Sequence, residues 1–441
     1  MIHFKFILLG VTLSLMVLSC KNGPLNKTQP SQSKYAVTIK KENGVYRLYK
    51  NGLPFFVKGA AGYDHISELA ASGANTLTIW NIDKFDSTLN EAAKDNISVI
   101  LGIDLPGWDF EEVYTDQKLM DELYIKITKI VARYKSHPAV LAWCLGNELI
   151  MPINPHSSIY YKNYNKILKM IHTDDPNHPV TTAIINFQKQ SILNIQWKIR
   201  DLDFISINTY NKLKEIKEEL AKVSLLWRGP YMISEWSPNG GWESETTVWE
   251  APIENTSTKK AEQFNIFYKN YMPVNDPRFL GSIAFYWGNR QEYTHTWYSI
   301  FDEAGIPTEI KEVLSDCWKD TVTKHESVKL EYMMIDGFGA RNNNLVSPGS
   351  KHLATLLFPA GQSTDSLKYN WEILKEDWSY WGRTWNNFKR QTPEMGLLSD
   401  SNKQNTNFIA PLKEGPYRIF ITVYNTKGYC ATANTPFYVV Q

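Results

Sequence analysis

The stretch VLAWCLGNELI, residues 140–150, decides the fold. Its first half is an apolar run, which is typical of a strand buried on both faces of a parallel sheet. The run then ends in Gly146, Asn147 and Glu148, which a buried strand does not favour. Polar residues gathered at the carboxyl end of an apolar strand indicate a parallel β/α fold with a site at that end.

Similar apolar strands alternate with amphipathic helices on both sides of this stretch. The first strand is FFVKGA (55–60) and the closing helix is PTEIKEVLSDCWK (307–319). Eight such units in about 265 residues fit a closed (β/α)₈ TIM barrel. An open doubly wound sheet is the alternative, but it usually has fewer units, and no glycine-rich phosphate loop follows the first strand.

The regions that flank the barrel have a different character. ENG (42–44) and KNG (50–52) are hairpin signals, so we expect a catalytic barrel over 35–324 that includes an N-terminal hairpin. After residue 325, short apolar runs are separated by turn sequences, and YRIFITVYNTKGYCATANTPFYVV (417–440) predicts two strands joined by a turn. We therefore expect residues 325–441 to form an all-β immunoglobulin-like sandwich domain.

The N-terminus has the pattern of an export signal. Residues 1–19 contain one lysine and then an apolar stretch, and predict a signal peptide. The sequence LSC, ending at Cys20, resembles a bacterial lipobox, which implies lipidation of Cys20 and a lipidated tether over 20–34. An ordinary signal peptide with a chance cysteine is the alternative. The prediction is a secreted bacterial lipoprotein, anchored through lipid to the outer membrane or cell surface, or facing the periplasm.

Charge and cysteine content exclude several classes of protein. The 441 residues include 47 basic and 46 acidic side chains, for a formal net charge of +1, so no basic field is available for nucleic acid. If Cys20 is lipidated, three of the four cysteines remain, an odd number for a disulfide framework. No His/Cys spacing suggests zinc, and we expect no metal and no cofactor.

Polar and aromatic residues stand where the predicted strands end, at the mouth of the barrel. The candidates there are Asp64, His65, Trp80, Asn147, Glu148, Asn208, Tyr210, Glu235, Trp236 and Trp287. Trp242 joins them from the long loop 237–256, whose length suggests function. Glu148 and Glu235, on the fourth and seventh strands, face each other across the mouth. Glycoside hydrolysis needs such a pair, one acid protonated and one ionised. Tryptophan offers a flat apolar face to a sugar ring.

These motifs match a known family. AWCLGNE (142–148) resembles the acid/base signature of clan A glycoside hydrolases, especially the TIM barrel domain of glycoside hydrolase family 2. MISEWS (232–237) resembles their nucleophile strand, residues 57–81 are similar to the opening of their barrel, and FISINTY (204–210) is similar to its sixth strand. The resemblance implies a retaining mechanism with Glu148 as acid/base, Glu235 as nucleophile, Asn147 on the sugar 2-hydroxyl, Tyr210 hydrogen-bonded to the nucleophile and Trp287 as sugar platform.

The domain order refines the resemblance. A barrel followed by a sandwich looks like the bacterial endo-β-1,3-glucanase lipoproteins, which implies a β-linked polysaccharide or oligosaccharide, β-glucan first, as substrate. A transglycosylase acting on β-glucan is one alternative. A non-catalytic glycan-binding lipoprotein on a degenerate barrel is another.

One position departs from the family. Its pattern Asn-x-x-Arg-x-Trp appears here as NTLTIW (75–80), with Thr78 where an arginine normally helps to keep the nucleophile ionised. Glu235 must then find another donor, for which Asn208, Tyr210 and Arg290 are the candidates. This departure motivates the non-catalytic alternative.

Overall fold

A computed structural model describes residues 36–153, 157–376 and 390–441. The predicted signal peptide, Cys20 and most of the tether fall in 1–35, outside the described residues. Within the described part of the chain, no helix combines the length and apolar character that crossing a membrane requires.

Eight parallel strands close into a barrel, as the sequence predicts. Around the barrel the strand order is β10-β11-β4-β5-β6-β7-β8-β9, so that neighbours in the chain are neighbours in space. The strands are β4 (Val57–Gly62), β5 (Thr76–Ile79), β6 (Ser98–Ile103), β7 (Val140–Leu145), β8 (Val180–Ile185), β9 (Phe204–Asn208), β10 (Tyr231–Trp236) and β11 (Phe279–Trp287). Every neighbouring pair is parallel, so all eight carboxyl ends meet at one mouth.

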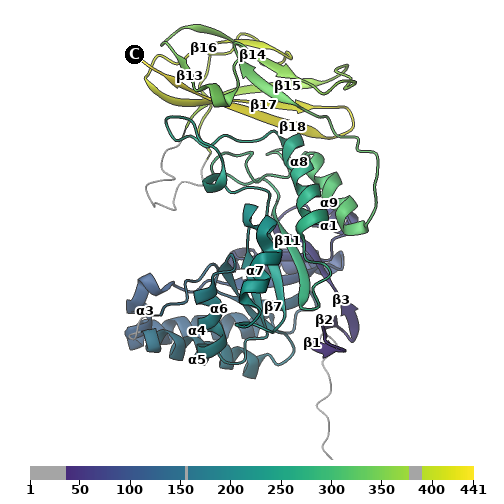
Figure 1. Ribbon diagram of the computed structural model, residues 1–441, viewed down its shortest axis with the longest axis vertical. Coiled ribbons are helices and arrows are strands. Elements are labelled where there is room, and N and C mark those ends of the chain that lie inside the picture. Colours follow the sequence, from purple (N-terminus) through teal and green to yellow (C-terminus); the bar gives the residue numbers. More distant parts are fainter. Residues whose placement is uncertain (1–35, 154–156, 377–389) are drawn as a thin grey trace, which may run out of the picture. The chain divides into compact units, whose positions relative to one another are not determined.

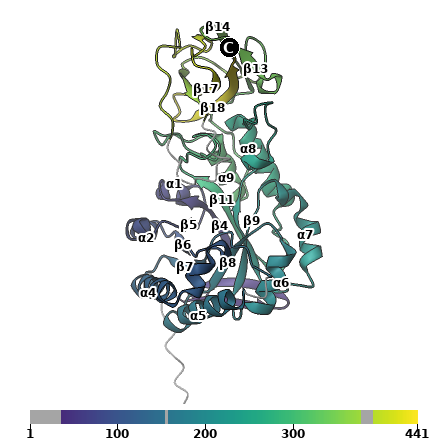
Figure 2. The same cartoon turned by 90° about the vertical axis from the view of Figure 1, so that its left-hand side faces the viewer.

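Helices surround the strands (Figures 1 and 2). They are α1 (Ile66–Ala71), α2 (Phe85–Lys94), α3 (Glu111–Thr115), α4 (Gln117–Tyr134), α5 (Ser158–Asp174), α6 (Lys189–Lys198), α7 (Ile216–Val223), α8 (Ser257–Ile266) and α9 (Glu309–Lys319). Helix α4 shows why they form: the Asp116 side chain caps its first turn, and Met120, Ile127, Val131 and Tyr134 bury one face. An outer core lies between helices and strands, and a separate inner core fills the barrel.

A small sheet closes the amino end of the barrel. Strands β1 (Val37–Glu42), β2 (Val45–Lys50) and β3 (Leu53–Phe55) are antiparallel, and both connecting turns are Asn-Gly pairs with positive φ, as their hairpin signals predict. Val37 and Leu48 belong to the inner core. Backbone bonds from this sheet reach Asn177 and Pro277, just before β8 and β11. The N-terminal sheet therefore covers the end of the barrel opposite the carboxyl ends of the strands.

The C-terminal residues form the predicted β-sandwich. One sheet has the order β12-β14-β16 and the other β13-β18-β17-β15. The strands are β12 (Tyr332–Ile335), β13 (Asn344–Val346), β14 (Lys351–Leu357), β15 (Lys368–Lys375), β16 (Thr406–Ile409), β17 (Gly415–Tyr424) and β18 (Cys430–Val439). Trp371, Phe408 and Phe437 lie in the shared core of the two sheets.

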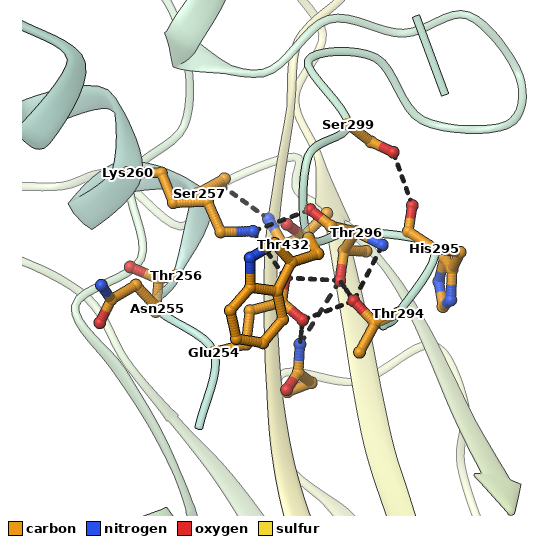
Figure 3. A network of polar contacts seen from close by, with 12 residues as sticks. Glu254, Asn255, Thr256, Ser257, Lys260, Thr294, His295, Thr296, Ser299 and Thr432 are labelled. Carbon is orange, nitrogen blue, oxygen red and sulfur yellow. Dashed lines mark hydrogen bonds and ion pairs between the residues drawn. The ribbon is translucent and has the colours of Figure 1, made fainter. Parts of the chain in front are cut away.

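A buried polar network joins the sandwich to the barrel loops (Figure 3). The Glu254 carboxylate accepts hydrogen bonds from Lys260 Nζ at 2.6 Å, Thr294 Oγ1 at 2.6 Å, Thr296 Oγ1 at 2.8 Å and Asn434 Nδ2 at 2.7 Å. Asn434 lies on β18, and the two threonines lie in the loop after β11. Because every donor is buried, the network fixes this loop against the sandwich.

We predict that Glu254→Gln destabilises the protein by about 3–5 kcal/mol, because it leaves the buried ammonium of Lys260 without its anion. Urea unfolding followed by tryptophan fluorescence measures the change. Glu245→Gln is the matched control, since it removes an exposed ion pair with Arg341 and should leave the midpoint unchanged. Equal midpoints for both variants would show that the network contributes no stability.

Candidate active site

Two left-handed residues deliver Asn147 and Glu148 to the mouth. Gly146 has φ of 86° and Glu148 has φ of 51°, so the chain turns sharply after β7. A Cβ atom on Gly146 would stand 2.2 Å from Cδ1 of Leu149, a contact that requires movement of a core side chain. Glycine is therefore required here both for its conformation and for its size.

An irregularity in β10 delivers Glu235. Met232 faces the inner core and Ile233 the outer core, as strand alternation requires. The pairing register then shifts between Ile233 and Glu235, so that Ser234 and Glu235 both reach inward to the same neighbour on β9. Trp236 returns to the outer core.

The amide of Asn208, at the end of β9, joins the two acids. Its Nδ2 lies 3.1 Å from Asn147 Oδ1, 3.2 Å from Glu148 Oε1 and 3.2 Å from Glu235 Oε2. Ser234 Oγ donates to Asn208 Oδ1 at 2.7 Å, which fixes the orientation of the amide. Since both acid oxygens lie 3.2 Å from one nitrogen, they are at most twice that distance, 6.4 Å, apart.

Tyr210 supports Glu235 from the other side. Its hydroxyl donates a hydrogen bond to Glu235 Oε1, the contact that the family resemblance implies. The Tyr210 ring packs edge-on against Trp242, with centroids 5.1 Å apart. Phe285 and Tyr298 lie 6.4 and 5.8 Å from the same ring. These four rings form an aromatic wall beside the acids.

The environment of the acids favours protonation. Burial raises the pKa of Glu235 to about 8; the negative charges of Glu148 and Glu292 raise it too, while the Tyr210 hydrogen bond and Arg290 lower it. Burial also raises the pKa of Glu148, and Glu292 adds to that shift. Two buried carboxylates this close resist ionising together, so the pair holds about one proton near neutral pH.

No cation occupies the position where the family carries arginine. Leu77 and Ile79 of β5 face the outer core, so Thr78 faces inward, 5% exposed. Its hydroxyl has no hydrogen-bond partner among the described residues. Arg290, from the loop after β11, lowers the pKa of Glu235, but its ion-pair partner Glu292 raises that pKa.

Trp236 and Trp287 are not at the mouth, and the prediction that they contact a sugar is wrong. Both side chains are 0% exposed in the outer core. Trp287 Nε1 donates to the backbone carbonyl of His65 at 3.0 Å, and its ring packs on Trp318. The reason is a register shift between Ala284 and Trp287, which turns the last tryptophan of β11 outward.

The other predicted residues have mixed surroundings. Trp80 is half-buried against β6 at the edge of the inner core, and Trp242 is 57% exposed. Asp64 is exposed after β4. His65 stacks on Phe301 with centroids 4.2 Å apart. Trp80, Trp242 and Asp64 therefore offer accessible surface, whereas one face of His65 is covered.

Sequence reasoning missed Ser234, Phe285 and Tyr298. Ser234 orients the shared amide, and Phe285 and Tyr298 complete the aromatic wall. Nothing in the sequence marked Ser234 as a functional residue apart from its position before Glu235. Phe285 lies in the run FYW (285–287), where only the register of β11 decides which ring faces inward.

The described residues contain no group of three or more histidine, cysteine, aspartate or glutamate side chains that could hold a metal ion. Cys144, Cys317 and Cys430 are buried and free.

Residues 87–263, which include both acids, match the family model for the TIM barrel domain of glycosyl hydrolases family 2. The chain carries a glycoside hydrolase TIM barrel, which over these residues is similar to that of family 2. Among curated proteins, mannan endo-1,4-beta-mannosidase F of Aspergillus clavatus is 29% identical over 129 residues, which are 26% of this chain and 29% of that protein.

Solved glycoside hydrolases share the fold at low identity. Bacteroides uniformis beta-glucuronidase 2 is 12% identical with a TM-score of 0.50, over 92% of this chain and 48% of that one. The beta-D-glucuronidase of Dictyoglomus thermophilum is 17% identical with a TM-score of 0.50, over 66% of this chain and 55% of that one. The chain thus spans about half the length of these glucuronidases and under a third of the mannosidase.

We predict that Gly146→Ala loses both stability and activity. Left-handed backbone costs an alanine about 1–2 kcal/mol, and the contact with Leu149 adds to that. Gly361→Ala is the matched control, because Gly361 has a similar φ of 83° with open space around it. Urea unfolding and glycoside hydrolysis measure both variants. If they lose equal stability and keep equal activity, the packing at Gly146 has no role in placing Glu148.

Proposed function

We propose that the protein is a retaining β-glycoside hydrolase that acts on a neutral β-linked polysaccharide. One observation carries the proposal: Glu148 and Glu235 each place an oxygen 3.2 Å from the same nitrogen of Asn208. Retaining enzymes hold their carboxyl groups about 5–5.5 Å apart, whereas inverting enzymes need about 6.5–9.5 Å to admit a water. Two acid oxygens that lie at most 6.4 Å apart, together with the family resemblance, support the retaining class.

The contacts support a different role for each acid. Glu235 accepts from Tyr210 and Asn208, and two donors favour its charged form, as a nucleophile requires. Glu148 accepts only part of the shared Asn208 amide and burial raises its pKa, which supports its role as the acid.

Catalysis then follows in two steps. Glu235 attacks the anomeric carbon while Glu148 gives its proton to the leaving oxygen, and a glycosyl ester forms on Glu235. Glu148, now ionised, takes a proton from water, which attacks the same carbon and releases Glu235. The Asn147 amide, in contact with Asn208, stands beside the acids for a sugar hydroxyl.

Two substrates are candidates. Sequence resemblance points to β-1,3-glucan, and the similarity to a mannan endo-1,4-beta-mannosidase points to β-1,4-mannan. Both are neutral, which suits a site whose nearby cation, Arg290, is already paired with Glu292 at 2.6 Å. The exposed ring of Trp242 supplies an apolar face for a sugar.

Purified protein should be incubated with β-1,4-mannan, laminarin, mixed-linkage glucan and aryl β-galactosides, and the products identified by mass spectrometry. We expect shorter oligosaccharides from mannan or laminarin. Products longer than an oligosaccharide substrate would identify a transglycosylase. Retention on a glycan affinity gel without released reducing ends would identify a binding protein and overturn the proposal.

We predict that Glu148→Gln and Glu235→Gln each lower kcat at least about 10²–10⁴-fold, because each removes a group that moves a proton or forms a bond. Azide should restore turnover of an activated aryl glycoside to Glu148→Gln only, since that variant keeps its nucleophile. Glu218→Gln, on the exposed face of α7, is the matched control and should retain full activity. Wild-type rates in either catalytic variant would contradict the assignment.

We also propose that residues 1–19 are removed on export and that Cys20 is lipidated, which would tether the barrel to a membrane surface. The LSC sequence supports this proposal. Metabolic labelling with a clickable fatty acid in a bacterial host should mark the wild-type protein and not Cys20→Ser. Equal labelling of both would overturn it.

A further inference from the structure

We propose that the N-terminal hairpin is a docking surface for the phosphate-bearing headgroups of an anionic membrane. The hairpin consists of β1 and β2, and its exposed cations are Lys40, Lys41 and Arg47. The inference does not depend on glycoside hydrolysis. The choice of a membrane as the partner rests on the proposed lipidation of Cys20, which would hold this part of the chain close to lipid.

Positive charge is unevenly distributed along the chain. The formal net charge of the whole chain is +1, but residues 20–58 contain eight lysine and arginine side chains and one acidic side chain, Glu42. Residues 59–441 contain 38 basic and 45 acidic side chains. The predicted tether and the first strands after it are therefore strongly basic, whereas the rest of the barrel and the sandwich are net negative.

The exposed cations of the hairpin lie close together. Lys40 and Arg47 are directly opposite each other on β1 and β2, where like charges disfavour pairing, and Lys41 follows Lys40. None of the three has an ion-pair partner among the described residues. The one acid of the hairpin, Glu42, accepts a hydrogen bond from the Tyr49 hydroxyl at 2.6 Å. An anionic surface would supply the counter-charge that the hairpin lacks.

The face that carries Lys40 and Arg47 points away from the barrel. Val37 and Leu48 belong to the inner core of the barrel. Because successive residues of a strand point to opposite faces, Lys40 and Arg47 lie on the other face of the sheet, toward solvent. This face is therefore available to a partner.

Two further lysines of the region bind the barrel itself. Lys50 Nζ donates to Ser98 Oγ at 2.7 Å, and Lys58 Nζ donates to the backbone carbonyl of Trp318 at 2.5 Å. In the described part of the chain, the docking cations of this region are thus limited to the three exposed ones.

An exposed apolar side chain lies beside the entry of the chain into the fold. Leu53, the first residue of β3, is 71% exposed. The N–H of Asn51, in the turn before it, donates to the carbonyl of Ala36 at 3.0 Å, so this turn meets the point where the predicted tether ends. Binding at a membrane interface combines electrostatic attraction with burial of apolar surface, and this end of the protein offers both.

Docking through the hairpin would turn the mouth of the barrel away from the membrane. Backbone bonds hold the hairpin beside Asn177 and Pro277, just before β8 and β11, at the amino end of the barrel. Glu148 and Glu235 stand at the carboxyl ends of their strands. A polymer in solution could then reach the acids without competition from the lipid surface.

The experiment uses the chain without residues 1–20, so that no acyl chain contributes to binding. Residues 35–441 form one compact unit apart from residues 1–34, so the shortened chain retains the fold. Co-sedimentation compares vesicles of phosphatidylglycerol and phosphatidylcholine with vesicles of phosphatidylcholine alone. We expect binding to the anionic vesicles only, and its loss when salt rises from about 0.05 to about 0.5 M, because salt screens exposed charges.

The variant Lys40→Gln/Lys41→Gln/Arg47→Gln should bind the anionic vesicles about 100-fold more weakly, since each cation at such a surface contributes about fivefold. Leu53→Ser should weaken binding at low salt as well, because it removes the apolar contact. The matched control replaces three exposed lysines of the sandwich by glutamine and should bind as the wild type does; these lysines are Lys351, Lys368 and Lys413.

Equal binding by the two triple variants would overturn the inference, as would a wild-type chain that binds neither kind of vesicle or binds both equally. Retention on dextran sulfate without binding to vesicles would assign the cations to an acidic polymer and would also overturn it. Glycoside hydrolysis by the same preparations tests the proposed function separately, because the hairpin substitutions lie at the amino end of the barrel and should leave kcat unchanged.

Discussion

Two carboxyl groups gathered around one buried amide nitrogen are the constraint on which the site depends. Asn208 Nδ2 carries two hydrogens and meets three oxygens, so Glu148, Glu235 and Asn147 share its donors. Two buried carboxylates at this separation resist ionising together, and the pair keeps a proton to unusually high pH. A double displacement needs one protonated and one ionised acid, and two acids that hold a single proton between them meet this need.

Irregular backbone at the carboxyl ends of β7 and β10 produces this arrangement. A left-handed glycine releases Asn147 and Glu148 from β7, and a register shift in β10 turns Ser234 and Glu235 inward together. The N-terminal sheet covers the amino end of the barrel, opposite the mouth. The sandwich contributes through Asn434, which helps to fix the loop that carries Arg290 and Glu292.

Sequence patterns predicted the barrel, the sandwich and the two acids, because each depends on periodicity or on position at a strand end. They failed for Trp236 and Trp287, since the face on which a residue lies after a bulge depends on pairing register, which one chain does not reveal. The sequence alone revealed that Thr78 departs from the family pattern. Which group takes the place of the arginine stayed open among Asn208, Tyr210 and Arg290, because the path of the loop after β11 depends on contacts with distant residues such as Asn434.

The central claim is that Glu235 forms a covalent glycosyl intermediate and Glu148 serves as acid and then base. The anomer released first tests it most directly. Proton NMR of a β-glycoside during its first turnovers, in deuterated buffer and faster than mutarotation, resolves the two anomeric protons. We expect the β-anomer to appear first and then to equilibrate. Initial release of the α-anomer would show single displacement by water and would exclude a glycosyl ester on Glu235.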